Sequence, residues 1–316
     1  MHKRTKAAVL AVLTVGVLVL TACSGGTGSG SGSSDSAKGN EVKGLTGVIG
    51  SKDFSEQYIL AYLTSDLLNA HGAKTTTNTK LVGSANVRDA MVAGQLMGYW
   101  EYTGTGWVTY LKNTAPVKGA AAQFAAVKKG DAANGIAWLD PAPLNNTYAF
   151  AIRSSEAKKL GVKTLSDVAK LPQKDQTFCI ESEFSTRDDG WPGLKKAYGI
   201  TVPDSNVSLL DTGVIYTTTQ KGNTCNFGEV FTTDGRIKAL DLTVMKDDKQ
   251  FFPVYQGAFT MKQATLDKYP GIAKVIALMA PKLTTEEMQK LNAQVDVDGD
   301  EPATVAKNWL QAQGLI

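Results

Sequence analysis

Four aromatic residues lie where predicted strands end, beside polar or glycine-rich turns, at positions that core packing would not predict. They are Tyr102, Tyr148, Phe231 and Tyr255. The electron-rich faces of such rings attract a quaternary ammonium group, at roughly 0.5–2 kcal/mol for each favourable contact. A trimethylammonium has no N–H to donate, so rings suit it better than carboxylates alone. Any one of these rings could instead belong to a core, but the placement of all four indicates a site for a methylated cation.

The elements that must position these rings alternate between strand and helix. We expect strands at 45–51, 74–82, 97–102, 147–152, 178–181, 207–210, 225–231 and 238–242, an extended segment at 252–261, and helices at 54–70 (stopped by Gly72), 85–93, 154–160, 165–169, 272–279, 285–295 and 303–313. This pattern is typical of α/β folds whose strands are joined by crossover helices. It predicts two α/β lobes, in which the chain leaves the first lobe, builds the second and returns. Ligands of such sheets bind beyond the carboxyl ends of the strands.

Motifs for other chemistries are missing from the sequence. There is no P-loop, no G-x-G-x-x-G after a strand and no Cys or His pair with zinc spacing, so we expect no metal and no cofactor. Apart from His2 near the N-terminus the chain has only His71, which is too little for a Ser–His–Asp triad plus a metal site. We expect His71 to be a surface residue at a helix C-terminus.

Acidic residues offer two weaker alternatives. The run from Asp296 to Glu301 hints at calcium, but it lacks the alternate-oxygen spacing and the distal Glu of a calcium loop, so we expect a helix N-terminus there. A hydrolase would have to depend on carboxylates such as Glu101 alone. We therefore expect no enzyme, and no catalytic residue is assigned.

The N-terminus predicts export and a membrane anchor. Residues 1–22 combine Lys3, Arg4 and Lys6 with a short apolar run, which is typical of a secretory signal; the run is short for the alternative, a transmembrane helix. Cys23 follows Leu-Thr-Ala and resembles the lipidated cysteine of bacterial lipoproteins, although it could be an unmodified Cys after a signal. Residues 23–44 are rich in Gly and Ser and predict a flexible tether. We expect a lipid-anchored body on the outer face of the membrane.

Net charge argues against a nucleic-acid partner. The chain has 316 residues, 33 Lys+Arg and 30 Asp+Glu, a formal charge of +3. Lys3, Arg4 and Lys6 lie within the predicted signal, and without them basic and acidic residues balance. Proteins that bind nucleic acids usually carry a basic surface stripe. We expect none here.

The remaining cysteines, Cys179 and Cys225, lie in two apolar, strand-like stretches. Adjacent strands could bring their α-carbons within bridging distance, and export would place them in an oxidising compartment. We expect a disulfide; two buried free thiols are the alternative.

Six segments of the sequence resemble the substrate-binding lipoproteins of osmoprotectant ABC importers, which bind glycine betaine, carnitine, choline or proline betaine. They are residues 50–57 (GSKDFSEQ), 101–105 (EYTGT), 145–149 (NNTYA), 187–194 (RDDGWPGL), 233–237 (TDGRI) and 255–258 (YQGA), in the family's order from about Thr46 to the C-terminus. The resemblance implies a type II periplasmic-binding-protein fold with two α/β lobes and a two-segment hinge. We expect residues 45–148 plus 255–316 to form lobe 1, and 149–254 to form lobe 2.

The resemblance also implies roles for individual residues. The aromatic cage falls on Tyr102, Tyr148, Phe231 and Tyr255, with Phe231 where a Tyr is common. The carboxylate of a betaine would meet Lys52, Thr105 and Arg187, and Asn146 would shape the cleft. Arg187 could hold a carboxylate bidentately, whereas Lys52 acts as a point charge. The alternatives are a solvated Lys52 and an Arg187 paired with Asp188 or Asp189.

The implied function is capture of quaternary-ammonium solutes, followed by hinge closure and delivery to an ABC permease by a monomer. Because choline has no carboxylate, Lys52 and Arg187 predict a preference for betaines. The alternatives are a binding lipoprotein for another small amine or amino acid, a cell-envelope hydrolase, and a scaffold or adhesion lipoprotein that binds no small ligand.

Overall fold

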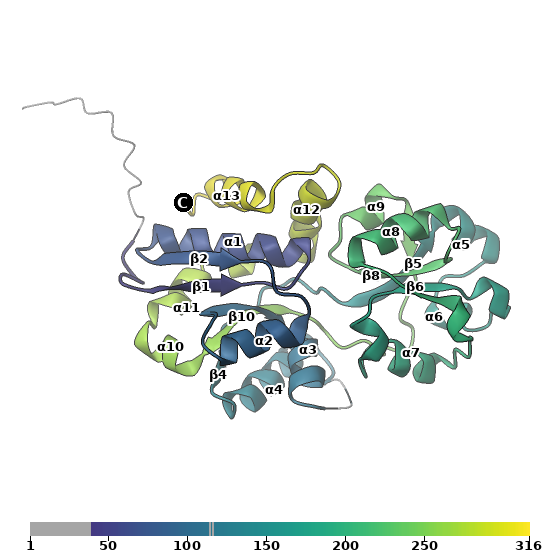
Figure 1. The fold of residues 1–316 in the computed structure, drawn as a ribbon, viewed down its shortest axis with the longest axis horizontal. Helices are drawn as coiled ribbons and strands as arrows, with labels where there is room; N and C mark the ends of the chain where they lie inside the picture. The colour runs from purple at the N-terminus through teal and green to yellow at the C-terminus, as the bar shows by residue number, and fades with distance from the viewer. Residues whose placement is uncertain (1–38, 114, 116) are drawn as a thin grey trace, which may run out of the picture. The chain divides into compact units, whose positions relative to one another are not determined.

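The computed structural model describes residues 39–113, 115 and 117–316, and in them two five-stranded mixed sheets. The first sheet has the order β2-β1-β3-β10-β4 and the second β7-β6-β8-β5-β9, and each belongs to one lobe (Figure 1). The predicted signal at 1–22, Cys23 and most of the tether lie outside the described residues. In the described part of the chain, no helix has the length and apolar character needed to cross a membrane.

The first lobe begins with the predicted alternation of strand and helix. Its strands are β1 (Thr46–Gly50), β2 (Lys74–Asn78), β3 (Gly98–Tyr102), β4 (Ile136–Trp138) and β10 (Gly257–Lys262), and its first helices are α1 (Ser55–Ala70), α2 (Ser84–Val92), α3 (Thr103–Thr105), a π-helical turn (Gly106–Tyr110) and α4 (Ala120–Ala132). Strands β2, β1 and β3 are parallel, whereas β10 runs antiparallel to β3 and β4. Helix α1 ends as predicted, with Gly72 at a φ of 96°.

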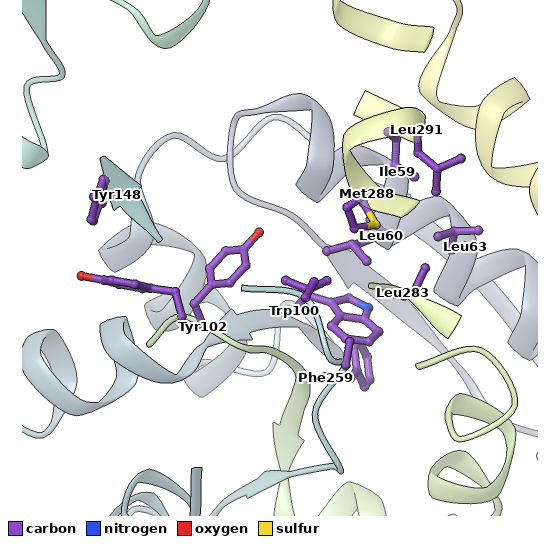
Figure 2. Packing of buried hydrophobic residues seen from close by; sticks show 14 of the residues in the cluster. Ile59, Leu60, Leu63, Trp100, Tyr102, Tyr148, Phe259, Leu283, Met288 and Leu291 are labelled. Atoms are coloured by element: carbon purple, nitrogen blue, oxygen red, sulfur yellow. The ribbon is translucent and has the colours of Figure 1, made fainter. Parts of the chain in front are cut away.

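Both faces of the first sheet are covered by helices. Trp100 and Phe259 pack with Ile59 and Leu63 of α1, while the neighbouring Tyr99 lies in a second cluster with residues of α2. This follows from the two-residue period of a strand, which sends adjacent side chains to opposite faces. The cluster around α1 also contains Leu283, Met288 and Leu291 from the C-terminal part of the chain (Figure 2).

The second lobe repeats the layered arrangement. Its strands are β5 (Tyr148–Arg153), β6 (Phe178–Ile180), β7 (Val207–Leu209), β8 (Phe227–Phe231) and β9 (Leu242–Val244), and its α-helices are α5 (Ser154–Leu160), α6 (Leu165–Val168), α7 (Trp191–Tyr198), α8 (Thr212–Lys221) and α9 (Arg236–Ala239). Phe150 of β5 packs near Trp191, with ring centroids 6.1 Å apart, while Ala149 and Ala151 pack with Tyr216 of α8 on the other face.

Two segments connect the lobes, residues 139–147 between β4 and β5 and residues 245–256 between β9 and β10. Asn145 and Gln256 form an isolated antiparallel bridge between them. The backbone N–H of Asn146 donates to Tyr255 O at 3.1 Å, and the side chain of Asn145 accepts from the N–H of Tyr255 at 2.8 Å. The crossing segments are thus paired with each other where the chain passes between the sheets.

After β10 the chain stays in the first lobe. Helices α10 (Gln263–Lys268), α11 (Gly271–Ile276), α12 (Thr285–Asp296) and α13 (Pro302–Ala312) complete it, and α13 lies along α1 (Figure 1). Helix α12 has a side-chain N-cap, because Thr284 Oγ1 accepts from the N–H of Glu287 at 3.1 Å. The chain therefore returns to the first sheet after it has built the second.

Cys179 and Cys225 are joined by a disulfide, with their α-carbons 5.8 Å apart. Cys179 lies in β6, and Cys225 precedes β8, the strand that pairs with β6 in parallel. The bridge therefore links two neighbouring strands of the second lobe.

Several local predictions were wrong. The segment 238–242 was expected to be a strand, but α9 extends to Ala239 and the strand begins at Leu242. The side chain of Asp234, just before the N-cap residue Gly235, accepts from the N–H of Arg236 at 2.8 Å at the start of this short helix. Helices α4, α7 and α8 were not expected, and the β-branched residues of α8 show how packing overrides helix propensity.

The predictions for His71, for the end of the tether and for the acidic run also need correction. His71 is not a surface residue: it is buried, and its Nδ1 lies 2.8 Å from Glu41 Oε2. Val42 is buried as well, so the folded body starts before the expected end of the tether at residue 44. In the acidic run, Asp296 ends α12 and accepts from Ser55 Oγ at 2.6 Å, and only Glu301 takes the expected place at a helix N-terminus.

Candidate functional site

A cavity of about 530 Å³ lies where the chain passes between the two sheets, and residues of both lobes line it. Its aromatic lining consists of the four predicted rings and one more: Phe54, Tyr102, Tyr148, Phe231 and Tyr255. The volume falls within the range of cavities that hold small organic ligands.

Strand register explains why the predicted rings meet. Tyr148 at the start of β5 pairs with Phe231 at the end of β8, since these strands are antiparallel. In the other lobe, Tyr102 at the end of β3 pairs with Gly257, two residues after Tyr255. Both pairs lie at the sheet edge formed by the carboxyl ends of parallel strands, the usual place for ligands in α/β sheets.

The rings form one continuous cluster. The Tyr148 ring centroid lies 5.2 Å from that of Phe231 and 5.3 Å from that of Tyr255, the second contact being edge-to-face. Phe54 stacks on Phe231 at 5.4 Å and on Tyr102 at 6.3 Å, so it connects the rings of the two lobes. The cluster therefore crosses from one lobe to the other.

Phe54 was not predicted as a site residue. A signal was present, because Phe54 follows the end of β1 within the segment 50–57, just as the other rings lie at strand ends. It also stands directly before α1, where a helical reading assigns it to the core. The ring of Phe54 is partly buried. It packs on the hydrophobic core and also lines the cavity, so it is both a core residue and a residue of the cavity wall.

Gly104 allows the ring of Tyr255 to pack closely against the backbone. An added Cβ there would lie 2.6 Å from a ring atom of Tyr255, a contact that real Cβ atoms do not make. Close packing against Tyr255 therefore accounts for the glycine in the segment 102–105.

Carboxylates hold the edges of two rings. The hydroxyl of Tyr102 donates to Glu56 Oε1 at 2.7 Å, and that of Tyr255 donates to Asp189 Oδ2 at 2.6 Å. Burial and the neighbouring carboxylate raise the pKa of both phenols well above the usual value, so they stay neutral. Asn146, which also lines the cavity, donates to Glu56 Oε1 at 2.7 Å. These hydrogen bonds hold the rings of Tyr102 and Tyr255 in their orientations.

Lys52 lines the cavity and is already paired. Its Nζ lies 2.6 Å from Glu101 Oε1 and 5.1 Å from the centroid of Tyr102. Lys52 is only 4% exposed, so the alternative of a solvated lysine is wrong. Its charge is balanced by Glu101, which leaves a weaker field for an anionic ligand.

Glu101 is fully engaged and fully buried. Besides Lys52, its carboxylate accepts from the Tyr102 N–H at 2.7 Å and from the hydroxyls of Tyr99 and Tyr110 at 2.8 Å each. It does not belong to the lining of the cavity. A carboxylate saturated in this way holds Lys52 in place and has no free oxygen for hydrolytic chemistry.

Arg187 stands behind the cavity wall rather than in it. Its guanidinium pairs with both carboxylate oxygens of Asp189, at 2.7 and 2.6 Å, and with Glu183 Oε1 at 2.9 Å. Of the two alternatives named for this arginine, the pairing with Asp189 is present. Among the described residues, Arg187 hydrogen-bonds to the other lobe through a single long contact of 3.5 Å from Nη2 to Thr105 Oγ1, and Thr105 does line the cavity.

Carboxyl groups make up much of the polar wall. Asp53, Glu181, Glu183 and Asp211 line the cavity together with Lys52. Glu183 also connects the lobes, since its Oε2 accepts from the N–H of Ser84 at 3.0 Å. Burial opposes its charge, but Lys52, Arg187 and that N–H lower the pKa of Glu183 below its usual value.

Comparisons with known proteins agree with this architecture. The model for the OpuAC family, the substrate binding domain of ABC-type glycine betaine transport systems, matches residues 47–312. A glycine-betaine-binding protein of Pseudomonas aeruginosa is 35% identical over 276 residues, covering 85% of this chain and 88% of that protein. A crystal structure of a glycine betaine/carnitine/choline ABC transporter aligns with a TM-score of 0.70 and 31% identity, covering 85% of this chain and 98% of that one.

The name of a third relative combines a permease with a binding protein. The ergothioneine transport permease/ergothioneine binding protein EgtU of Helicobacter pylori is 36% identical over 270 residues, which cover 85% of this chain but 48% of that protein. These relatives are binding and transport proteins rather than enzymes. The family match spans the folded body from β1 to α13, and so the chain belongs to the OpuAC family of substrate-binding domains of ABC-type glycine betaine transport systems.

Proposed function

We propose that the cavity binds the quaternary ammonium group of compatible solutes such as glycine betaine, carnitine and proline betaine, and also choline. The observation that carries the proposal is the convergence of the predicted rings Tyr102, Tyr148, Phe231 and Tyr255 on one cavity. Such faces attract a methylated cation without needing an N–H donor. Phe54 is the fifth ring of this cage.

The polar end of the solute lies against Lys52, Thr105 and Asn146, all of which line the cavity. Arg187 acts on a solute carboxylate through Thr105, because Asp189 already occupies two of its donors. Direct contact between Arg187 and a solute requires this pair to open.

Binding is coupled to closure of the lobes. The stacked pair Phe54–Phe231 and the hydrogen bond from Ser84 to Glu183 both join opposite lobes beside the cavity. A solute that adds contacts to both walls stabilises the closed form relative to the open one. Flexion occurs at the paired crossing segments around Asn145 and Gln256.

The closed form delivers the solute to an ABC permease. The relative in Helicobacter pylori, whose name joins a permease and a binding protein, supports this partnership. The chain acts as a monomer on the outer face of the membrane, held by a lipid on Cys23 and the Gly/Ser-rich segment that follows. Two acyl chains provide stable anchoring, at about 0.8 kcal/mol per buried methylene.

A thermal-shift screen followed by calorimetry tests the proposal. The ligands are glycine betaine, carnitine, proline betaine and choline, with glycine and an unmethylated amine as controls. At 100 times its dissociation constant, a ligand stabilises the protein by about 2.7 kcal/mol. Equal binding of the unmethylated controls would favour a general amine or amino-acid binder. No stabilisation by any ligand would favour a scaffold, and loss of solute over time would reveal a hydrolase.

A further inference from the structure

Glu181, in the second-lobe wall of the cavity, lies beside a second carboxyl group, Glu229, which is buried behind that wall. Glu181 follows β6 and Glu229 lies within β8, and these strands are parallel neighbours. The backbone N–H of Glu181 donates to Glu229 Oε2 at 2.7 Å. Glu229 is 2% exposed, and its Oε1 is buried without a hydrogen-bond partner among the described residues.

Glu181 has one occupied and one available oxygen. Its Oε1 accepts from the hydroxyl of Thr212, whereas Oε2 has no hydrogen-bond partner among the residues that the structure describes. Because Glu181 lines the cavity, this oxygen is the one that a solute can meet. The pattern suits a protonated acid, with a carbonyl that accepts from Thr212 and a hydroxyl that can donate to a ligand.

The surroundings of Glu181 disfavour a negative charge. The groups that face it are Asp53, Glu183, Asp211, Glu229 and Arg187. Four of them are carboxyls, and the single guanidinium is shared with Asp189 and Glu183. Burial first, and then the charges of Glu183, Asp53 and Asp211, raise the pKa of Glu181 to about 8 against the opposing effect of Arg187. Burial and the charge of Glu181 also raise the pKa of Glu229 well above its usual value.

We propose that Glu181 selects between zwitterionic and cationic solutes: as a neutral acid it donates a hydrogen bond to the carboxylate of a betaine, and as a carboxylate it repels that group. The inference rests on the proposed function of the cavity. The neutral Glu181 side chain supplies a contact to the solute carboxylate, which Lys52 and Arg187 contact only weakly because both are already paired. An ionised Glu181 instead accepts a hydrogen bond from a hydroxyl such as that of choline, whose charge it also attracts.

Calorimetry at pH 6.5 and pH 9.5 tests this with glycine betaine and choline, neither of which changes charge in that interval. For the wild-type chain, the affinity for glycine betaine should fall as pH rises, by up to about 30-fold if only the protonated acid binds it. The affinity for choline should stay constant or increase.

Two variants assign the effect to Glu181. In Glu181→Gln the amide donates at every pH, so glycine betaine should bind with the same affinity at both. Glu286→Gln makes the same chemical change at an exposed position in the first turn of α12 and should follow the wild type. Retained choline binding shows that Glu181→Gln is folded.

The outcomes separate the two proposals. A wild-type affinity for glycine betaine that does not change with pH, or a Glu181→Gln variant that keeps the wild-type pH dependence, overturns the role of Glu181 and leaves the cage intact. Absence of binding for both solutes at both pH values overturns the cage itself and the selector with it.

Discussion

The ring of Phe54 in the first lobe stacks on the ring of Phe231 in the second, with centroids 5.4 Å apart and an interplanar angle of 13°. Both rings line the same cavity. The cavity wall is therefore built from rings of both lobes, and under the proposed function this pair would connect binding of the cation with closure.

Replacing Phe54 by Leu should weaken binding of every quaternary-ammonium solute. Leucine keeps an apolar side chain but removes the ring face, and a lost cation–π contact costs roughly 0.5–2 kcal/mol, or about 2- to 30-fold in dissociation constant. Calorimetry with glycine betaine and choline measures the change. Phe124→Leu, at a partly buried ring outside the cavity, is the matched control. Equal effects of the two variants would count against Phe54 as a cage residue.

Replacing Lys52 by Met should destabilise the folded chain. The change leaves Glu101 buried without its cation, and breaking a buried ion pair costs about 3–5 kcal/mol. Urea unfolding without solute measures it. The double variant Lys52→Met/Glu101→Gln should recover part of the loss. The exposed pair Lys159–Glu156 provides a control, since Lys159→Met should change stability by less than about 1 kcal/mol.

Stability should decrease as pH rises through the interval in which Glu181 titrates. Its pKa is raised to about 8 in the folded chain from an ordinary value of 4.5, so between these values the folded state holds a proton that the unfolded state has lost. The stability that this proton provides is present at low pH and is lost as pH rises to about 8. Glu181→Gln should reduce this decline, so the variant gains on the wild type between pH 5 and 8.5, while Glu229, whose pKa is also raised, still titrates. Parallel unfolding profiles of the two proteins would contradict the prediction.

Removing the disulfide should lower stability without changing solute affinity. Cys179 and Cys225 are 46 residues apart in sequence, and closing a loop of that order contributes roughly 2–4 kcal/mol. Neither residue lines the cavity. Unfolding of Cys179→Ala/Cys225→Ala measures the loss, and alkylation followed by intact mass shows whether the wild-type thiols are oxidised. Unchanged stability would indicate a redundant bridge.

Replacing Cys23 by Ser should release the protein from the cell surface. Serine cannot form the thioether that anchors a lipoprotein, so the chain should move from the membrane fraction to the medium or periplasm. Ser24→Ala, next to it, should remain bound. Retention of Cys23→Ser at the membrane would show that another segment anchors the chain.

The sequence by itself determined the two α/β lobes and most of the aromatic residues that line the cavity. Strands and helices repeat hydrophobic patterns within short windows, so β1, α1 and β3 could be predicted without knowledge of what covers them. Tyr102 and Phe231 could also be assigned to a binding site from local patterns. Both end a predicted strand, and ligands of α/β sheets bind beyond the carboxyl ends of the strands.

Only the tertiary structure decided which partners the polar residues take. Lys52 pairs with Glu101, Arg187 with Asp189, and Glu181 stands beside Glu229. In the sequence, several carboxylates are chemically equivalent partners for Lys52 and Arg187. Which carboxylate each one pairs with depends on strand register and on which distant segments of the chain come together. The same holds for Phe54, which lines the cavity beside Phe231, the ring from the other lobe that stacks on it. The local hydrophobic pattern indicates which face of a strand or helix a side chain lies on. The tertiary structure determines which residues it contacts there.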